Sequence, residues 1–270
     1  MIRLRLTLLV GLPLLAQAPN PAKNAIGMEF VTIAPGEFVM GCSTIDSACD
    51  ADEKPAHRVQ ITKAFEIGKY EVTQAQWQAV MGSNPSTIKG DNRPVEQINW
   101  NEAQRFIWLM SFFGHGQYRL PSEWEYEYAA RALQPTSRYW GNEIDDGCAY
   151  ENIADKSLKE VEPEIAPAFA NCEDGYAWTA PVGQRWPNPW GLYDMFGNVA
   201  SWTEDCYSGN PSETPSDGAP NASGACTSRV IRGGSWYSVL RYDRAANRNY
   251  SAPGYRNNNL GFRLVRIIPP

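Results

Sequence analysis

The sequence predicts an α+β fold in which short strands and short helices are joined by long irregular segments. Apolar and polar residues alternate over residues 29–41 and 57–73, which is typical of strands. Three capping signals predict helices, and residues 136–189 show no periodicity at all. A chain of 270 residues, 43% of them hydrophobic, can bury one substantial core. We therefore expect a single domain over residues 26–270.

Strands are expected near the beginning and at the end of this domain. The stretch EFVTIAPGEFVMG has a Pro35-Gly36 turn between two alternating runs, which predicts a β-hairpin. The stretch HRVQITKAFEIGKYEVT predicts two more short strands. The apolar run GFRLVRII, which ends at Ile268, predicts a strand that completes the core sheet.

Each helix is marked by a capping residue that is followed three positions later by Gln or Glu. These two side chains can satisfy the free N–H groups at the start of a helix. The pairs are Thr73 with Gln76, Asn99 with Glu102, and Ser122 with Glu125. Apolar residues follow each pair, so we predict three short amphipathic helices.

Residues 136–189 are rich in Gly, Pro, Asn, Trp and acidic residues. Their aromatic content is too high for a disordered linker. An ordered segment of this kind has to satisfy its backbone polar groups through disulfides, bound ions or internal contacts. We expect an ordered, irregular segment here, and an exposed loop at residues 209–224.

The amino terminus and the net charge indicate an exported, acidic protein. Arg3 and Arg5 precede an apolar run at residues 6–15, and small residues follow it, which is the layout of a secretory signal. We expect residues 1–25 to be a signal peptide and the mature chain to be secreted, periplasmic or at the cell surface, without a membrane span, and monomeric. A net charge of −6 argues against nucleic acid as a partner.

The cysteines predict disulfides rather than a metal site, because an even number in an exported chain favours cross-links. None of them forms the closely spaced pair of a zinc site. Pairing of nearest neighbours would close three separate loops, but the sequence leaves the connectivity open. The six residues are Cys42, Cys49, Cys148, Cys172, Cys206 and Cys226.

Seven motifs occur in order over residues 29–265. They are EFVTIAPGEFVMG, DEKPAHRVQI, EVTQAQW, RLPSEWEYEYAAR, WGLYDMFGNVASWTED, RVIRGGSW and LGFRLV. This series resembles the formylglycine-generating enzyme (sulfatase-modifying factor) family over nearly the whole mature chain. The resemblance implies a C-type-lectin-like α+β fold with little regular secondary structure.

Enzymes of that family oxidise a sulfatase cysteine to formylglycine, with copper held by two cysteines shortly after the RGGS string. Thiolates suit this role because they are soft ligands for Cu(I). The matching positions here are Ser238 and Asp243, and no cysteine follows Cys226. We therefore expect neither copper nor formylglycine-generating activity.

A divergent metal-dependent oxidoreductase is the alternative, because related branches of the family are linked to other oxidations, in some cases with histidine-bound iron. An iron site of that type requires two histidines and a carboxylate to converge. The chain has only His57 and His115. We interpret His57 as a structural residue at a strand start and His115 as a helix cap.

The resemblance also implies one structural calcium ion, held in family members by side-chain and backbone oxygens of an irregular loop. The matching residues are Asn152, Ile153, Asp174 and Tyr176. Hard oxygen ligands suit calcium, which would make the segment rigid. The alternative is that these are turn residues only.

Residues 237–259 have the composition of a binding surface, in the region that forms the active-site wall in the family. Tyrosine supplies rigid contact area, and Ser and Asn supply adaptable hydrogen bonds. We expect a ligand-binding module for an unknown protein or small molecule. The candidate contact residues are Tyr237, Ser238, Arg241, Tyr242, Asp243, Tyr250 and Tyr255.

One hypothesis is that this stretch is diversified. Variable proteins of diversity-generating retroelements share the fold and mutate adenines of asparagine-rich templates in this region. Every residue type in 237–243 can be reached from an AAC codon by changing adenines alone. Asn247, Asn249 and residues 257–259 would then be unmutated positions. A binding protein of fixed sequence is the alternative.

Overall fold

The computed structural model of the chain describes most of the domain and leaves the amino-terminal segment out. The predicted signal peptide falls largely outside the described residues, as does His115. No helix in the part of the chain that is described is long and apolar enough to cross a membrane. The described residues are 23–113, 116–164, 169–210, 215, 217–222 and 226–268.

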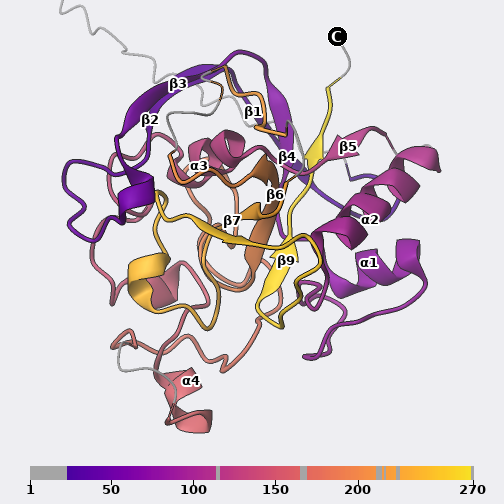
Figure 1. Cartoon of the computed structure of the whole chain (residues 1–270). Coiled ribbons are helices and arrows are strands. Elements are labelled where there is room, and N and C mark those ends of the chain that lie inside the picture. Colours follow the sequence, from indigo (N-terminus) through magenta and orange to yellow (C-terminus); the bar gives the residue numbers. More distant parts are fainter. Residues whose placement is uncertain are drawn as a thin grey trace, which may run out of the picture.

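Three small sheets form the framework, as Figure 1 shows. One has the antiparallel order β1 (Phe30–Ile33), β4 (Phe65–Gly68), β10 (Val265–Arg266), β5 (Tyr118–Arg119). The second pairs β2 (Gly36–Met40) with β3 (His57–Ile61). The third has the order β8 (Asn249–Ser251), β7 (Arg229–Arg232), β6 (Ala200–Cys206), β9 (Leu260–Phe262), with β6 and β9 parallel. This mixture of short elements confirms the predicted α+β class.

The predicted hairpin at residues 29–41 is wrong in its pairing, although both strands exist. β1 pairs with β4 and β2 pairs with β3, so the Pro35-Gly36 bend leads from one sheet into another. Alternation of apolar residues indicates which face of a strand is buried, but it does not select the hydrogen-bonding partner.

The predicted terminal strand is also divided between two sheets. β9 pairs with β6 and β10 pairs with β4, and the break falls at Arg263. The fully buried guanidinium of Arg263 donates to the backbone oxygens of Gly68, Tyr193 and Asp194. These hydrogen bonds connect the break between β9 and β10 with the end of β4 and with the loop at Tyr193 and Asp194.

The three predicted helices and their caps are confirmed. They are α1 (Gln74–Met81), α2 (Trp100–Phe112) and α3 (Glu123–Arg131), and each begins with a complete capping box. A further helix, α4 (Lys156–Val161), lies in the segment expected to be irregular. It begins where Asp155 accepts hydrogen bonds from the N–H groups of Ser157 and Leu158. Short 3₁₀ turns form η1 (Ala51–Glu53), η2 (Gly147–Ala149) and η4 (Leu240–Tyr242).

Helix α3 lies at the centre of the molecule. All nine of its residues are buried, and it contacts β2, β6 and β7. Helices α1 and α2 instead pack together on one flank (Figure 1). There the rings of Trp77, Phe106 and Phe262 lie within 5.9 Å of one another, measured between centroids. The buried position of α3 allows its charged side chains to reach several loops at once.

Nearest-neighbour pairing, one of the connectivities that the sequence left open, is what the structure contains. The disulfides are Cys42–Cys49, Cys148–Cys172 and Cys206–Cys226, with Cα–Cα distances of 5.8, 6.0 and 5.3 Å. Each closes one irregular loop, and together they use all six cysteines. The chain therefore has no free thiol in this state.

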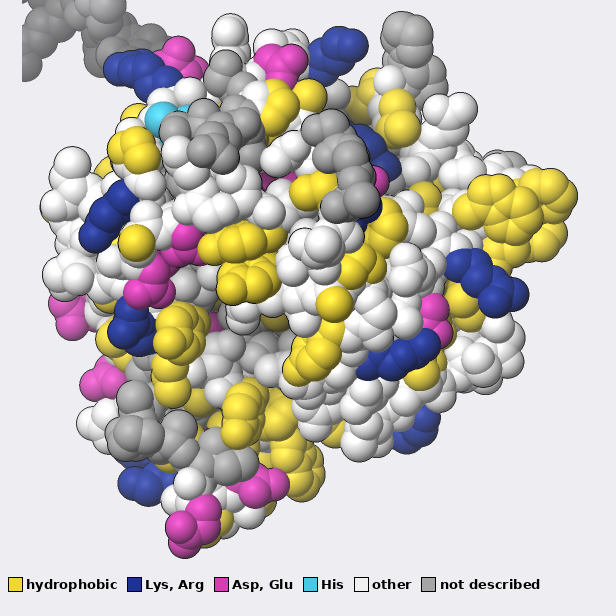
Figure 2. Space-filling model, viewed as in Figure 1, with side chains coloured by type: hydrophobic (Ala, Val, Ile, Leu, Met, Phe, Trp, Pro, Cys, Tyr) yellow, Lys and Arg dark blue, Asp and Glu magenta, His cyan; other side chains and the backbone are white. Residues whose placement is uncertain are grey.

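A group of exposed aromatic residues lies at the end of α2. Trp108, Phe112 and Phe113 are 60%, 67% and 62% exposed, and the rings of Trp108 and Phe112 stack on each other. Figure 2 shows hydrophobic side chains projecting on the side where Figure 1 places α2. Nothing in the described chain covers this group.

Candidate binding site

A polar cleft of about 150 Å³ opens where the chain after β7 passes the strands β6 and β9. Its wall comes from residues 231–242, 247–249 and 255–260 together with Ala200. The polar side chains that line it are hydroxyls and amides for the most part: Ser235, Ser238, Tyr242, Tyr255, Asn247, Asn249, Asn257 and Asn259. Such groups offer hydrogen bonds without net charge.

Two consecutive glycines direct the chain into this cleft. Gly233 and Gly234 have φ angles of +96° and +67°, in the region that side chains disfavour. A Cβ atom on Gly233 would lie 2.2 Å from the hydroxyl of Tyr126, and one on Gly234 would lie 1.8 Å from a carboxylate oxygen of Asp243. Only glycine fits either position, so the sharp turn after β7 follows directly from the sequence.

The floor of the cleft is a set of hydrogen-bonded polar groups. The hydroxyls of Ser235 and Ser238 are 3.0 Å apart, and the amide of Asn259 donates to Ser235 Oγ at 3.2 Å. The indole of the buried Trp236 donates to the backbone oxygen of Asn258. These bonds connect the segment after β7 with the asparagine-rich turn before β9.

The structure places the seven predicted contact residues in different positions. Ser238, Tyr242 and Tyr255 line the cleft. Tyr237 and Tyr250 lie outside its lining but are 42% and 51% exposed. Exposed tyrosines therefore extend the candidate surface beyond the cleft itself.

Arg241 and Asp243 differ from the tyrosines. Arg241 is half exposed and forms an ion pair with Asp50 at 2.5 Å. Asp243 is 1% exposed and lies against Gly234, beneath the surface. Burial raises the pKa of Asp243 well above its ordinary value, and the charge of Arg138 offsets part of that effect. A protonated Asp243 would leave the cleft above it neutral.

Buried ion pairs beneath the cleft fix the position of the segment that carries the candidate contact residues. Glu53 of η1 accepts two hydrogen bonds from Arg244, at 2.7 and 2.8 Å, and one from Asn247. Glu123 of α3 accepts two from Arg248, at 2.7 and 2.9 Å. The segment that carries the candidate surface lies beside η1 in Figure 1 for this reason.

A second carboxylate of α3 completes this network. Glu127 accepts hydrogen bonds from Arg232 and from Arg131. Arg232 also donates to the backbone oxygens of Ala245 and Asn247. Strand β7, helix α3 and the segment after η4 are therefore fixed to one another by charged groups that are almost fully buried.

Some residues of the site were missed by reasoning from the sequence. Ser235 belongs to the RGGS string, but it was not among the predicted contact residues, and it lines the cleft. Tyr207 had no signal, because its place in the site comes from a stacked contact with Tyr250, with ring centroids 3.9 Å apart. That contact joins segments that are distant in the chain.

The four residues predicted to hold calcium lie together. Asp174 accepts hydrogen bonds from the N–H groups of Ile153, at 2.9 Å, and Tyr176, at 2.8 Å. The side-chain oxygen of Asn152 is buried without a donor among the described residues. Burial and the neighbouring carboxylate of Asp155 raise the pKa of Asp174 to about 7. A divalent cation could be coordinated by the side-chain oxygen of Asn152, and it would favour the ionised form of Asp174. These residues therefore fit calcium.

Within the described ranges, no three His, Cys, Asp or Glu side chains come together in a way that could hold a metal ion. A calcium site at Asp174 would therefore depend on amide and carbonyl oxygens as well as its carboxylate. His57 begins β3, and its ring lies 5.8 Å from that of Trp124, measured between centroids.

Comparison with known proteins places these features in context. Residues 16–268 match the model of the sulfatase-modifying factor enzyme 1-like domain. Chaperone protein LppX of Paenibacillus barcinonensis is 35% identical over 75% of this chain and 80% of its own length. The formylglycine-generating enzyme of Streptomyces coelicolor is 33% identical over 72% of this chain, and the match spans 59% of that enzyme.

Two solved structures share the fold over almost the whole chain. PvdO from Pseudomonas aeruginosa superposes with a TM-score of 0.79 at 28% identity, over 93% of this chain and 100% of that one. Variable protein 1 of Treponema denticola superposes with a TM-score of 0.74 at 26% identity, over 92% of this chain and 99% of that one. Both are similar to this chain in the overall arrangement of the domain.

Replacement of Glu53 by Gln should destabilise the protein by about 2 kcal/mol or more, because it removes the ionised acceptor of two hydrogen bonds from the buried Arg244 and leaves Asp46 as the carboxylate paired with that arginine. The matched control is Asp50→Asn, which removes an exposed ion pair and should cost less than about 1 kcal/mol. Free energies of unfolding from urea titrations measure both. Equal effects of the two substitutions would show that the buried network contributes little.

Proposed function

We propose that this chain, which belongs to the family of sulfatase-modifying factor enzyme 1-like domains, is a binding protein that holds a partner protein on the surface of residues 235–259. The observation that carries the proposal is the surface itself. Four tyrosines, Tyr237, Tyr242, Tyr250 and Tyr255, are 41–51% exposed around a cleft of hydroxyls and amides. Rigid aromatic area beside adaptable hydrogen-bonding groups is typical of protein-binding surfaces.

Formylglycine generation requires thiolates that this surface does not offer. All six cysteines are in disulfides, and Ser238 and Asp243 occupy the positions where the resemblance places the copper ligands. A serine hydroxyl and a buried carboxyl are hard oxygen groups, whereas Cu(I) prefers soft sulfur. The proposal therefore assigns binding, and no oxidation, to this region.

A protein partner suits the dimensions better than a small molecule. The cleft of about 150 Å³ is smaller than the roughly 300 Å³ or more that is usual for sites of drug-sized ligands. Tyr237 and Tyr250 lie beyond its lining, and a ligand confined to the cleft would leave them unused. We expect one polar side chain of the partner to enter the cleft while the tyrosines cover the surface around it.

We propose further that the protein is exported and that the surface is diversified. Three disulfides are typical of oxidising compartments, in agreement with the signal layout of the first residues. The similarity to variable protein 1 of Treponema denticola supports diversification. So does the position of Asn247, Asn249, Asn257 and Asn259, all of which line the cleft.

Changing Tyr237, Tyr242 and Tyr255 together to serine should abolish partner binding and leave folding intact, because these exposed rings do not support the core. Cross-linking capture from native host and neighbouring cells, compared between this variant and wild type, measures the first effect. Thermal unfolding measures the second. The matched control changes three exposed aromatic residues outside the cleft, Trp108, Phe112 and Phe113, to serine.

Two results would contradict this assignment. One is a specific partner captured equally by wild type and the triple variant. The other is an aldehyde formed by the wild-type protein, supplied with copper and oxygen, on a cysteine peptide taken from a sulfatase, which would establish the family's enzymatic activity.

Diversification predicts a genetic signature. Deep sequencing of the gene's last hundred or so codons in one culture should find substitutions limited to adenine positions of a nearby near-repeat. The affected codons should be those of exposed residues within 237–259, and the codons of the buried Arg232, Arg244, Arg248 and Arg263 should stay constant. A uniform sequence without any repeat would leave a binding protein of fixed specificity.

We also propose one structural calcium ion at Asn152, Ile153, Asp174 and Tyr176. Without calcium, native Asp174 keeps its proton up to about pH 7, whereas the unfolded chain loses it near pH 4. The native state then binds more protons in this window, so stability falls as the pH rises from about 4 to about 7. Calcium binds the ionised form, and its effect should grow over the same window.

The expected result is a calcium-dependent rise in Tm that is small at pH 5 and several degrees at pH 7.5. Asp174→Asn should remove the calcium-dependent part of the rise, whatever its own effect on stability. Thermal unfolding in calcium and in chelator, at both pH values, measures it. Identical Tm values in calcium and chelator at pH 7.5 would rule the ion out.

A further inference from the structure

Among the residues that the structure describes, strand β2 has a strand partner on one edge and none on the other. Its partner is β3, in a register that ends with Met40 opposite His57. Just beyond it, the N–H of Cys42 donates to Glu53 O on the β3 side, at 2.9 Å. Gly41 turns the other way, toward α3. Its N–H donates to Glu127 at 2.8 Å and its oxygen accepts from Arg131 at 2.7 Å.

Because the N–H and C=O groups of Gly41 point toward α3, they show which backbone groups of β2 are free. Successive residues of a strand point their N–H and C=O groups to alternate sides. Glu37 and Val39 therefore direct theirs to the same side as the N–H of Gly41, away from β3. Across the described residues, no hydrogen bond reaches these groups from outside the β2–β3 pair. An unpaired edge of this kind is a template for another strand.

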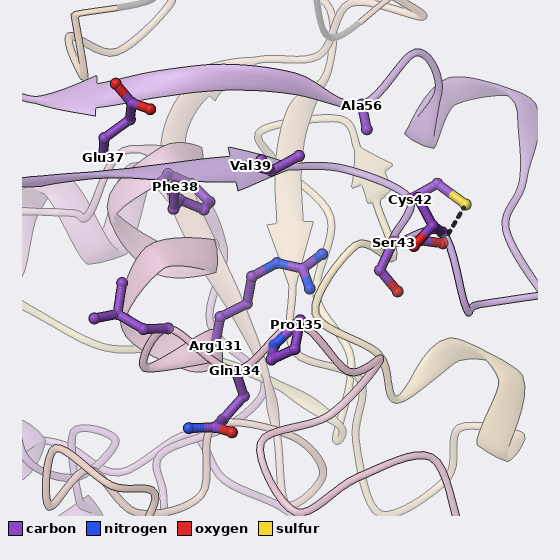
Figure 3. Close-up of a pocket in the computed structure, with 11 residues that line it drawn as sticks. Glu37, Phe38, Val39, Cys42, Ser43, Ala56, Arg131, Gln134 and Pro135 are labelled. Atoms are coloured by element: carbon purple, nitrogen blue, oxygen red, sulfur yellow. Dashed lines mark hydrogen bonds between the residues drawn. The ribbon is translucent and has the colours of Figure 1, made fainter.

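A cavity of about 360 Å³ lies along this edge, and Figure 3 shows it. Glu37, Phe38 and Val39 line one side, and the chain that leaves α3, including Gln134 and Pro135, lines the other. Leu133 is also part of the lining. Val39 and Leu133 are 52% and 59% exposed. The free edge of β2 therefore faces a largely apolar cavity.

The wall opposite β2 is preformed. Ala132 and Leu133 have φ angles of +45° and +65°, which are uncommon for residues with side chains. Hydrogen bonds from Ala132 N–H to Tyr128 O, and from Gln134 N–H to Arg131 O, hold them there. The disulfide of Cys42 closes the end of the cavity. An occupant would thus enter a space whose shape is already fixed.

Charge indicates what kind of occupant fits. The two ionised side chains at the cavity already have partners, because Arg131 pairs with Glu127 and Glu37 pairs with Arg58. A free carboxylate or a lysine side chain would find no unpaired counter-charge here. The complementary occupant is an uncharged, internal stretch of polypeptide.

We propose that the free edge of β2 and this cavity form a docking site for an extended, uncharged segment of a partner polypeptide. The segment adds a third strand to the β2–β3 sheet, hydrogen bonds to Glu37 and Val39, and places an apolar side chain between Val39 and Leu133. None of these residues lines the cleft after β7, so the site is independent of the proposed function.

The probe is an N-acetylated, C-amidated hexapeptide of alternating threonine and valine, titrated into the full-length protein while backbone amide shifts are followed by NMR. We expect shifts at Glu37, Val39, Leu133 and Gln134, with a Kd of about 1 mM or below. The matched control is the same peptide with every amide N-methylated. It keeps the side chains but donates no backbone hydrogen bond, and it should bind at least about tenfold more weakly.

A protein variant provides an independent check. Val39→Pro removes one outward N–H and keeps the bonds to β3, since proline is tolerated on edge strands. It should unfold at nearly the wild-type temperature and bind the peptide at least about tenfold more weakly. Val39→Thr keeps the N–H and should bind as wild type does. If Val39→Pro fails to fold, the methylated peptide still decides the question.

Three results would overturn the proposal. One is the absence of shifts at these four residues with the peptide at several times the expected Kd. Another is equal binding of the methylated and unmethylated peptides, which would mean that the cavity recognises side chains without adding a strand. The third is the same set of shifts produced by raising the protein concentration alone, which would show that a second copy of the chain occupies the edge.

Discussion

The structure depends on a buried network of carboxylates and guanidinium groups centred on α3. Glu123 and Glu127 bind Arg232 and Arg248, and Glu53 binds Arg244. The segment from β7 to β8 has little regular secondary structure, so it cannot be positioned by a ladder of strand hydrogen bonds. Bidentate ion pairs are directional, and they fix where this segment lies in a way that apolar contacts alone would not.

The same network connects the two surfaces of the molecule. One oxygen of Glu127 accepts hydrogen bonds from Gly41 at the end of β2, while the other binds Arg232 below the cleft. Arg131 extends the connection to the backbone oxygen of Gly41. The edge of β2 and the cleft after β7 are therefore both supported by α3. A change at Glu127 would affect both, whereas changes in the exposed side chains of either surface leave the support in place.

The sequence predicts those features of the fold and the site whose interacting residues lie close together in the chain, and it does not predict those whose residues lie far apart. The capping boxes at Thr73, Asn99 and Ser122 were correct because both partners lie within one helical turn. The partners of β1 and β2 were wrong because alternation says nothing about which strand lies alongside. The pair of Glu53 with Arg244 had no signal, since neither residue is unusual until the fold brings them together.

The neutrality of the cleft follows from the same arrangement. Arg232, Arg244 and Arg248 beneath it are paired with carboxylates, and burial favours the protonated form of Asp243. Recognition there must come from hydrogen bonds of Ser and Asn and from the area of the tyrosines. The exposed tyrosines can change without exposing a buried charge, whereas Asn247 donates a hydrogen bond to the buried Glu53 and is fixed by it. The specificity of such a surface can change through its exposed side chains, while the buried ion pairs that stabilise the fold remain the same.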